Sequence, residues 1–178
     1  MVCPWGWSDR ERRQSHNPHN KPMPACTAPQ PANGQRGDEK CLKKMLHAER
    51  VLWLNHGNLI GDDTDGHVDT VARLAPNDTI VYMQCSDEND AQYADLKAME
   101  EEIAELRTAE GKPYRMIPLP SPAPIHDKDG ERLPATYANF LIMNNCILYP
   151  TYAQEENDRK AAVALGKAFP GHEIVGID

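Results

Sequence analysis

The sequence predicts an α/β fold built from a repeated unit of strand, hairpin turn, strand, helix and strand. Three observations support this. Residues 77–82 and 144–149 are alike, Asn-Asp-Thr-Ile-Val-Tyr against Asn-Asn-Cys-Ile-Leu-Tyr. The tripeptide Glu-Asn-Asp follows each copy, at 88–90 and 156–158. Each tripeptide leads into an amphipathic pattern and then a short apolar run, the order expected of tandem structural units.

The first 37 residues are expected to form a disordered or atypical N-terminal segment. They are rich in Pro, Asn, Gln, Arg and His and contain almost no aliphatic residues. Such a segment cannot bury enough apolar surface to offset the entropy lost on ordering. Residues 38–178 are expected to form the globular part, which is long enough for one domain.

The globular part is expected to begin with a helix at 38–47, followed by a short strand at 51–54 and a polar loop at 56–65. The helix has four apolar residues on one side: Cys41, Leu42, Met45 and Leu46. The strand is an apolar run, Val-Leu-Trp-Leu. The loop is rich in Gly and Asp, which favour turns.

The repeated units come next. Strands are expected at 67–74 and 138–143, with second strands at the two similar segments. Helices are expected at 90–108 and 157–169, and third strands at 114–119 and 173–177. One unit, of roughly 65 to 70 residues, cannot cover its own apolar face, so tandem units should stack and close around an axis.

Charge and composition restrict the classes of partner. The net charge is −8 and the isoelectric point is near 5.3, which argues against a nucleic-acid or anionic-membrane partner. No apolar run approaches the roughly 18 residues of a membrane span. The first seven residues lack the pattern of a signal peptide. The five cysteines form no Cys-x-x-Cys pair, so neither a disulfide framework nor a zinc site is indicated, and a cytoplasmic location is expected.

The densest polar cluster is residues 61–69, Gly-Asp-Asp-Thr-Asp-Gly-His-Val-Asp. If 67–74 is a strand, His67 and Asp69 project from the same face. The two could act as a general acid/base pair, or Asp69 could bind a cation while His67 transfers a proton. A solvated Asp-rich loop explains the cluster equally well. A calcium loop does not fit, because its first and twelfth ligand positions would fall on Gly61 and Ala72.

Two cysteines of the globular part follow or lie in expected strands. Cys85 precedes an expected helix start at Ser86-Asp87, where a thiol pKa can be lowered. A structural thiol is the more frequent role of such a residue. Cys146 lies within an apolar strand and is expected in the core.

Four segments resemble the agmatine deiminases and the related bacterial peptidylarginine deiminases: 51–54 (Val-Leu-Trp-Leu), 63–69 (Asp-Thr-Asp-Gly-His-Val-Asp), 134–140 (Pro-Ala-Thr-Tyr-Ala-Asn-Phe) and 149–150 (Tyr-Pro). The resemblance is collinear over 38–178, which would form a partial deiminase domain. It implies a pentein-type five-bladed α/β propeller, of which this chain would supply about two to three strand-strand-helix-strand modules.

The resemblance also implies a chemistry without metal or other cofactor. A cysteine thiolate attacks the guanidinium carbon of agmatine, ammonia leaves, and water releases N-carbamoylputrescine for putrescine synthesis. Asp69 would hold the guanidinium and His67 would transfer protons. Asn139 and Asp63 would also bind the substrate. For Asn139 a structural amide is an equal alternative, and Asp63 would shape the loop together with Asp65.

Two expected groups have no match in the sequence. The family's nucleophilic cysteine follows the strand that matches 173–177, beyond Asp178, and a second guanidinium-binding carboxylate lies in an earlier module. We therefore expect a truncated chain with little or no activity by itself. A peptidylarginine deiminase and a non-catalytic protein that binds guanidinium or polyamines are the alternatives. The expected partner is a small cationic guanidine, without nucleic acid or membrane, and a homo-oligomer is possible.

Overall fold

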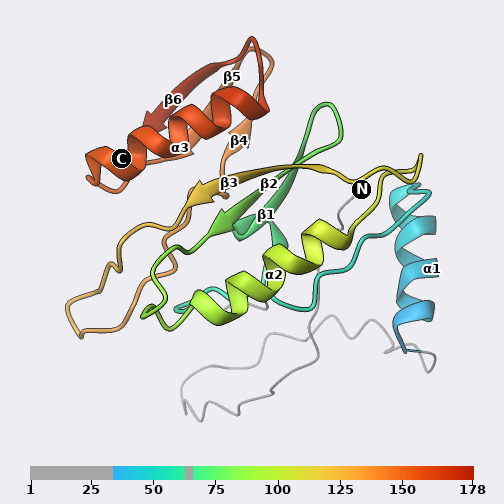
Figure 1. The fold of residues 1–178 in the computed structure, drawn as a ribbon, viewed down its shortest axis with the longest axis horizontal. Helices are drawn as coiled ribbons and strands as arrows, with labels where there is room; N and C mark the ends of the chain where they lie inside the picture. Colours follow the sequence, from blue (N-terminus) through green and yellow to red (C-terminus); the bar gives the residue numbers. More distant parts are fainter. Residues whose placement is uncertain (1–33, 63–65) are drawn as a thin grey trace, which may run out of the picture.

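The computed structural model describes residues 34–62 and 66–178 (Figure 1). Its elements in chain order are α1 (Gly34–Leu46), the 3-10 turn η1 (Val68–Thr70), β1 (Ala72–Ala75), β2 (Thr79–Gln84), α2 (Tyr93–Glu105), β3 (Arg115–Pro120), β4 (Leu141–Ile142), β5 (Cys146–Pro150), α3 (Glu155–Ala168) and β6 (Glu173–Ile177). The predicted α/β class is confirmed.

The predicted repeat is present as two units of the same topology. The sheet β1-β2-β3 carries α2 between its second and third strands, and the sheet β4-β5-β6 carries α3 in the same place. In each sheet the first two strands are antiparallel and the last two are parallel. The parallel registers also agree, because Thr79 pairs with Arg115 as Cys146 pairs with Glu173.

The core is formed by both helices packing against the first sheet. One cluster joins α2 to one face of β2 through residues such as Ile80, Leu96 and Met99. A second cluster joins β2 and β3 to the second unit and includes Val81 and Leu165. Five of the six residues of β2 are therefore buried, as expected of a strand covered on both faces. Figure 1 shows α2 lying across the first sheet and α3 beside β5 and β6.

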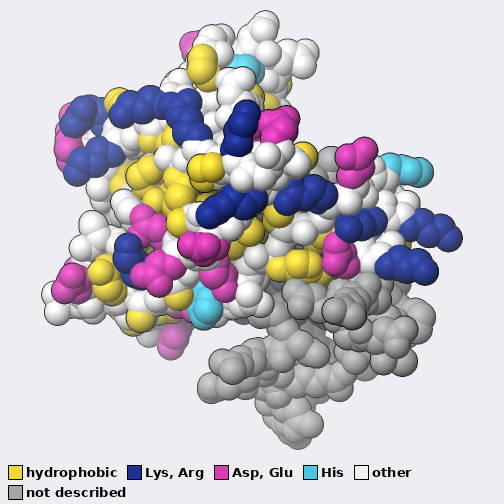
Figure 2. All heavy atoms as spheres, turned by 45° about the vertical axis from the view of Figure 1, so that its right-hand side comes forward, with side chains coloured by type: hydrophobic (Ala, Val, Ile, Leu, Met, Phe, Trp, Pro, Cys, Tyr) yellow, Lys and Arg dark blue, Asp and Glu magenta, His cyan; other side chains and the backbone are white. Residues whose placement is uncertain are grey.

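The second sheet is less covered than the first. In β5, burial alternates, with Ile147 and Tyr149 buried and their neighbours half-buried. Leu141, Ile142 and Met143, in and beside β4, are exposed. On the face drawn in Figure 2, hydrophobic side chains lie among separate groups of basic and acidic side chains. Within the described part of the chain, no helix is both long and apolar enough to cross a membrane.

The first helix differs from its prediction. It begins at Gly34, four residues before the expected start and inside the segment expected to be disordered; residues 1–33 lie outside the described part. Of its four apolar residues only Leu42 is half-buried, and Cys41, Met45 and Leu46 are exposed. The apolar side is thus not covered by the described residues.

Three predicted strands are shorter than expected or replaced by other structure. Residues 51–54 form a bridge only at Leu52, because the chain bends at Asn55, where α2 holds its backbone. Residues 67–71 form η1 and its caps before β1 begins. Only Leu141–Ile142 of the expected strand 138–143 is β structure, because backbone groups before it bond to side chains, including the carbonyl of Phe140 to Arg73.

The shared tripeptide does not mark equivalent positions. Asp90 precedes α2 and binds Arg132, whereas Asp158 lies inside α3 and accepts hydrogen bonds from the backbone N–H groups of Tyr152 and Gln154. The equivalent residues are Gln92 and Gln154, which cap α2 and α3. The second hairpin also differs in register, since Ala75 pairs with Thr79 but Ile142 pairs with Ile147.

Candidate functional site

His67 and Asp69 lie on a tight turn instead of a strand. His67 is the N-cap of η1, and Asp69 is its middle residue. The Thr70 hydroxyl and backbone N–H both donate to the His67 carbonyl, at 2.6 and 3.1 Å, and such local bonds compete with strand pairing. The turn nevertheless brings Nδ1 of His67 to 3.9 Å from Oδ1 of Asp69, and each side chain is 36% exposed. His67 and Asp69 therefore lie close together as predicted, but a turn brings them together and not a strand.

The segment that contains Asn139 lies against this turn. The Thr136 hydroxyl donates to the Thr70 carbonyl at 2.6 Å. Arg73 reaches the same segment, donating to the Phe140 carbonyl at 2.9 Å with its guanidinium 4.8 Å from the centre of the Phe140 ring. The segment 134–140 thus contacts residues just after His67 and Asp69, through hydrogen bonds between residues 66 and 67 positions apart in the sequence. Asn139 itself is exposed on this segment, and Asp63 lies outside the described residues.

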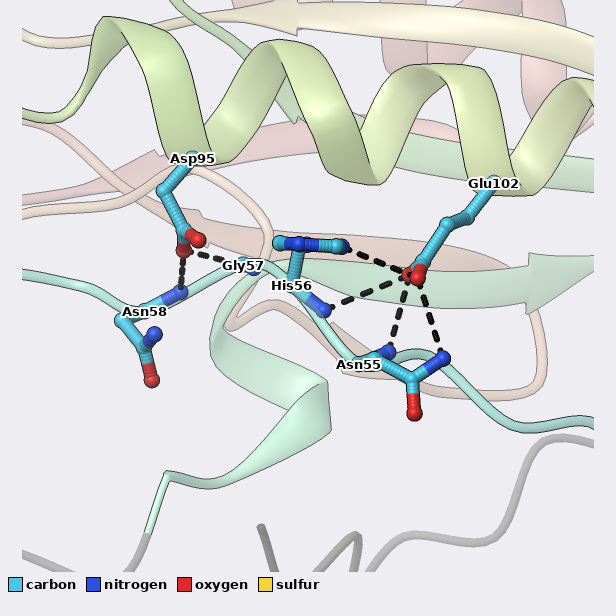
Figure 3. Close-up of polar contacts among 6 residues, drawn as sticks. All are labelled: Asn55, His56, Gly57, Asn58, Asp95 and Glu102. Atoms are coloured by element: carbon cyan, nitrogen blue, oxygen red, sulfur yellow. Dashed lines mark hydrogen bonds and ion pairs between the residues drawn. The ribbon is translucent and has the colours of Figure 1, made fainter. Parts of the chain in front are cut away.

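The chain enters the site through residues 55–62, which α2 holds by their backbone (Figure 3). Asp95 accepts the N–H groups of Gly57 and Asn58 at 2.8 and 2.6 Å. Glu102 accepts four hydrogen bonds, two backbone and two side-chain, from Asn55 and His56, at 2.8 to 3.3 Å. These are charge-assisted bonds, so they hold the backbone of residues 55–58 firmly against α2.

Gln92 completes this anchoring and was not identified from the sequence. It is 2% exposed, and its side-chain oxygen accepts the N–H of Ile60 at 2.8 Å. In the second unit, Gln154 accepts the N–H of Ala123 at 2.7 Å in the same manner. The sequence does place a glutamine just before each amphipathic helix, which could have identified Gln92 and Gln154 as equivalent residues. The shared Glu-Asn-Asp tripeptide instead aligned the two units in a different register.

Replacing Glu102 by Ala is expected to lower the free energy of unfolding by about 2 kcal/mol, because several donors lose a charged acceptor. Glu101→Ala is the matched control, since it makes the same change at an exposed position of the same helix; its effect should stay within about 0.5 kcal/mol. Urea unfolding of the two variants checks this. Equal losses in both would show that the Glu102 contacts contribute little.

The contribution of Glu102 to the free energy of unfolding should also depend on pH. Burial alone would raise the pKa of Glu102, but the hydrogen bonds from Asn55 and His56 outweigh it and hold the pKa below its usual value. The stabilisation is therefore complete above the unfolded-state pKa, about 4.3, and is lost as the pH falls through the lower folded-state value. The difference between the wild type and Glu102→Ala should shrink in acid.

The described cysteines do not form an activated thiol at this site. Cys85 is 8% exposed, and burial is the main reason that its pKa is raised. α2 begins only at Tyr93, so the expected helix start at Ser86-Asp87 is wrong and Cys85 does not lie at a helix N-terminus. Cys146 is half-buried in β5, instead of fully in the core. Among the described residues, no three His, Cys, Asp or Glu side chains are grouped to hold a metal ion.

Comparison with known proteins identifies the family. A family model described as Porphyromonas-type peptidyl-arginine deiminase matches residues 29–178. A protein from Marinomonas sp. (strain MWYL1), assigned as an agmatine deiminase, is 37% identical over 155 residues, which cover 78% of this chain and 42% of the relative. The chain therefore spans less than half the length of this curated relative.

Two solved structures agree with this match. A protein from Porphyromonas gingivalis, assigned as an arginine deiminase, is 50% identical, with a TM-score of 0.75 over 78% of this chain and 40% of its own. An agmatine deiminase from C. jejuni, a cysteine-to-serine variant with substrate bound, is 38% identical, with a TM-score of 0.73 over 81% of this chain and 41% of its own. Because the family model matches most of its length, this chain belongs to the Porphyromonas-type peptidyl-arginine deiminase family.

Proposed function

We propose that this chain carries the guanidinium-binding and proton-transferring part of an agmatine deiminase, which hydrolyses agmatine to N-carbamoylputrescine and ammonia in putrescine synthesis. The observation that carries the proposal is the His67–Asp69 pair, 3.9 Å apart and half-exposed on a turn that the segment 134–140 holds. The agmatine deiminases among the similar proteins support it. We further propose that the two units are modules of a five-bladed α/β propeller.

Each group has a defined role in the proposed reaction. Asp69 binds the guanidinium, whose planar donors match a carboxylate. A thiolate forms a bond to the guanidinium carbon, and the C–N bond breaks as His67 donates a proton to the departing ammonia. His67 then takes a proton from the water that attacks the same carbon, and the C–S bond breaks to release the carbamoyl product. Asn139 and Asp63 are proposed to contact or surround the substrate.

The thiolate of this mechanism is not assigned to Cys85, because that thiol is buried and its pKa is raised. The resemblance instead places the nucleophile on a cysteine after the strand that corresponds to β6. The C. jejuni structure with bound substrate, a cysteine-to-serine variant, is consistent with substrate binding that does not need the thiol. The 178-residue chain is therefore expected to bind agmatine but to release little ammonia from it.

Calorimetric titration with agmatine tests the proposal. Asp69→Asn should raise the dissociation constant about 10- to 100-fold, because a charged hydrogen-bond acceptor of the guanidinium is lost. Asp129→Asn is the control, since it makes the same change at an exposed turn position. It should leave the affinity unchanged. A folded wild-type chain that gives no heat with agmatine, or equal affinities in the two variants, would overturn the proposed function.

A peptidyl arginine is the second candidate substrate. The description of the matching family model, a peptidyl-arginine deiminase, favours it. Both substrates present the same guanidinium to Asp69 and differ in the group attached to its alkyl chain. Competition between agmatine and a blocked arginine peptide in the same titration distinguishes them. Tighter binding of the peptide would favour the arginine-directed activity.

A further inference from the structure

We propose that Thr136 is a positioning residue for the His67–Asp69 pair and acts through the carbonyl of Thr70. The catalytic meaning of this inference rests on the proposed function, because it assumes that the pair binds and protonates the substrate. The positional claim itself rests only on contacts between Thr136 and the turn η1.

The core holds the turn η1 only at its apolar residue Val68 and at its C-cap Val71, which is buried. None of its three residues is buried, and its apolar packing comes from Val68, which is half-buried against the core cluster that contains Leu96. Its internal bonds run from Thr70 back to His67, with the Thr70 hydroxyl at 2.6 Å and its N–H at 3.1 Å from the His67 carbonyl. These bonds shape the turn, but they do not attach it to the rest of the molecule. A polar contact from outside the turn would therefore add to the packing of Val68 and help to fix the polar side of η1.

Thr136 supplies that contact. Its side chain is buried, with the residue 3% exposed. Its hydroxyl donates its single proton to the Thr70 carbonyl at 2.6 Å and accepts the N–H of Ala138 at 3.0 Å. The accepted bond orients the hydroxyl, and the β-branched side chain has few rotamers. The donor is therefore aimed at the turn before any substrate arrives.

Thr136 is in turn held by the second unit. The Tyr152 hydroxyl accepts the Thr136 N–H at 3.0 Å and donates to the Thr136 carbonyl at 2.9 Å. The Tyr152 ring packs edge-on against Tyr137, with 5.3 Å between ring centres. A chain of hydrogen bonds thus runs from Tyr152 through Thr136 and Thr70 to His67. It joins a residue just after β5 to the candidate site in the first unit.

This arrangement matters because reacting groups must be held close to their productive geometry. A displacement of about 1 Å can greatly lower the reaction rate. Replacing Thr136 by Val keeps the shape of the side chain but removes both the donor and the acceptor. The Thr70 carbonyl then loses this partner, and η1 can move relative to the segment 134–140. Thr136→Ser restores the hydroxyl and should restore the position of the turn.

The experiment compares NMR spectra of Thr136→Val, Thr136→Ser and Thr108→Val in the 178-residue chain without ligand. Thr108 is the matched control, because it is also buried and its hydroxyl also bonds to the backbone. It accepts hydrogen bonds from the N–H groups of Glu110 and Lys112. Thr136→Val should displace the amide peaks of Val68–Thr70 and the His67 ring peaks more than Thr108→Val does. Thr136→Ser should leave them near their wild-type positions.

Agmatine titration adds the functional readout. The dissociation constant should rise about three- to tenfold in Thr136→Val, the equivalent of one lost hydrogen bond, and should stay unchanged in Thr108→Val even if both variants lose similar stability. If the wild type shows no response to agmatine, the proposed function fails, while the ligand-free spectra still decide whether Thr136 positions the turn.

A fourth variant covers the case in which Thr136→Val does not fold. Tyr152→Phe keeps the ring against Tyr137 but removes the hydroxyl that holds Thr136. It should displace the same Val68–Thr70 and His67 peaks in the ligand-free chain. If neither Tyr152→Phe nor a folded Thr136→Val moves these peaks beyond the Thr108→Val control, the inference is wrong.

Discussion

Replacing Arg132 by Met is expected to lower the free energy of unfolding by about 3 to 5 kcal/mol, because it leaves the buried Asp90 carboxylate without its partner. The guanidinium meets Asp90 in a bidentate pair, Nη1 to Oδ1 at 2.7 Å and Nη2 to Oδ2 at 2.9 Å. The two side chains are only 15% and 8% exposed. Denaturant unfolding of the variant measures the loss.

The exposed ion pair between Arg159 and Glu156 provides the control. It has a similar distance, 3.0 Å, but its side chains are 64% and 62% exposed. Arg159→Met should therefore change the stability by less than about 1 kcal/mol. A comparable loss in both variants would mean that burial does not strengthen the Arg132 pair.

The double variant Arg132→Met with Asp90→Asn separates the pair from its surroundings. If the cost of Arg132→Met comes from an unpaired charge, neutralising Asp90 should recover part of it, and the double variant should lose less than the sum of the single losses. An additive double variant would show that the aliphatic part of Arg132 matters more than its charge.

The pair also predicts a loss of stability in acid. The hydrogen bond from Arg132 is the main cause that holds the pKa of Asp90 below its ordinary value, against the opposing effect of burial. The contribution is complete above the unfolded-state pKa, about 3.9, and is lost as the pH falls through the lower folded-state value. The stability difference between the wild type and Asp90→Asn should therefore narrow at low pH.

The sequence was most informative where the burial of side chains follows the period of a strand or a helix. The buried run of β2 and the alternation in β5 follow from strand geometry and from the number of covered faces. The internal repeat predicted the order of elements in both units, because each unit must bury its apolar face against the next. Those features depend on short-range patterns, which a single sequence records.

The features that could not be predicted depend on particular long-range hydrogen bonds. The turn η1 replaces a strand because Thr70 bonds to His67 and Thr136 bonds to Thr70. Asp95 and Glu102 bind backbone groups more than 30 positions earlier in the chain. Polar side chains of this kind have no periodic signature, so their partners become visible only in the folded chain.

The candidate site contains both residues that the sequence predicted and residues that it did not. His67 and Asp69 were found from their spacing and from the resemblance, and the structure brings them together. Thr136, which binds the turn, and the α2 side chains Asp95 and Glu102, which bind residues 55–58, were not found. They bind the backbone and need no distinctive spacing. The residues proposed to react were thus easier to single out from the sequence than the residues that contact their backbone.

Replacing Gly61 by Ala is expected to cost about 3 kcal/mol or more of unfolding free energy. Gly61 has φ of +89°, a conformation that costs a residue with a Cβ roughly 1–2 kcal/mol. An added Cβ would also lie 2.1 Å from the carbonyl oxygen of Arg132. Because the obstacle is backbone, it cannot move aside as a flexible side chain could, and overpacking adds about 1–3 kcal/mol.

Gly130→Ala isolates the steric part of this effect. Gly130 has φ of +85°, close to that of Gly61, but an added Cβ there would have no atom within 4 Å. It should lose only the roughly 1–2 kcal/mol of backbone strain. Thermal and urea unfolding of both variants give the comparison. If Gly61→Ala were no more destabilising than Gly130→Ala, the close approach between the loop 55–62 and Arg132 would not exist in solution, and the site loop would have to be held by α2 alone.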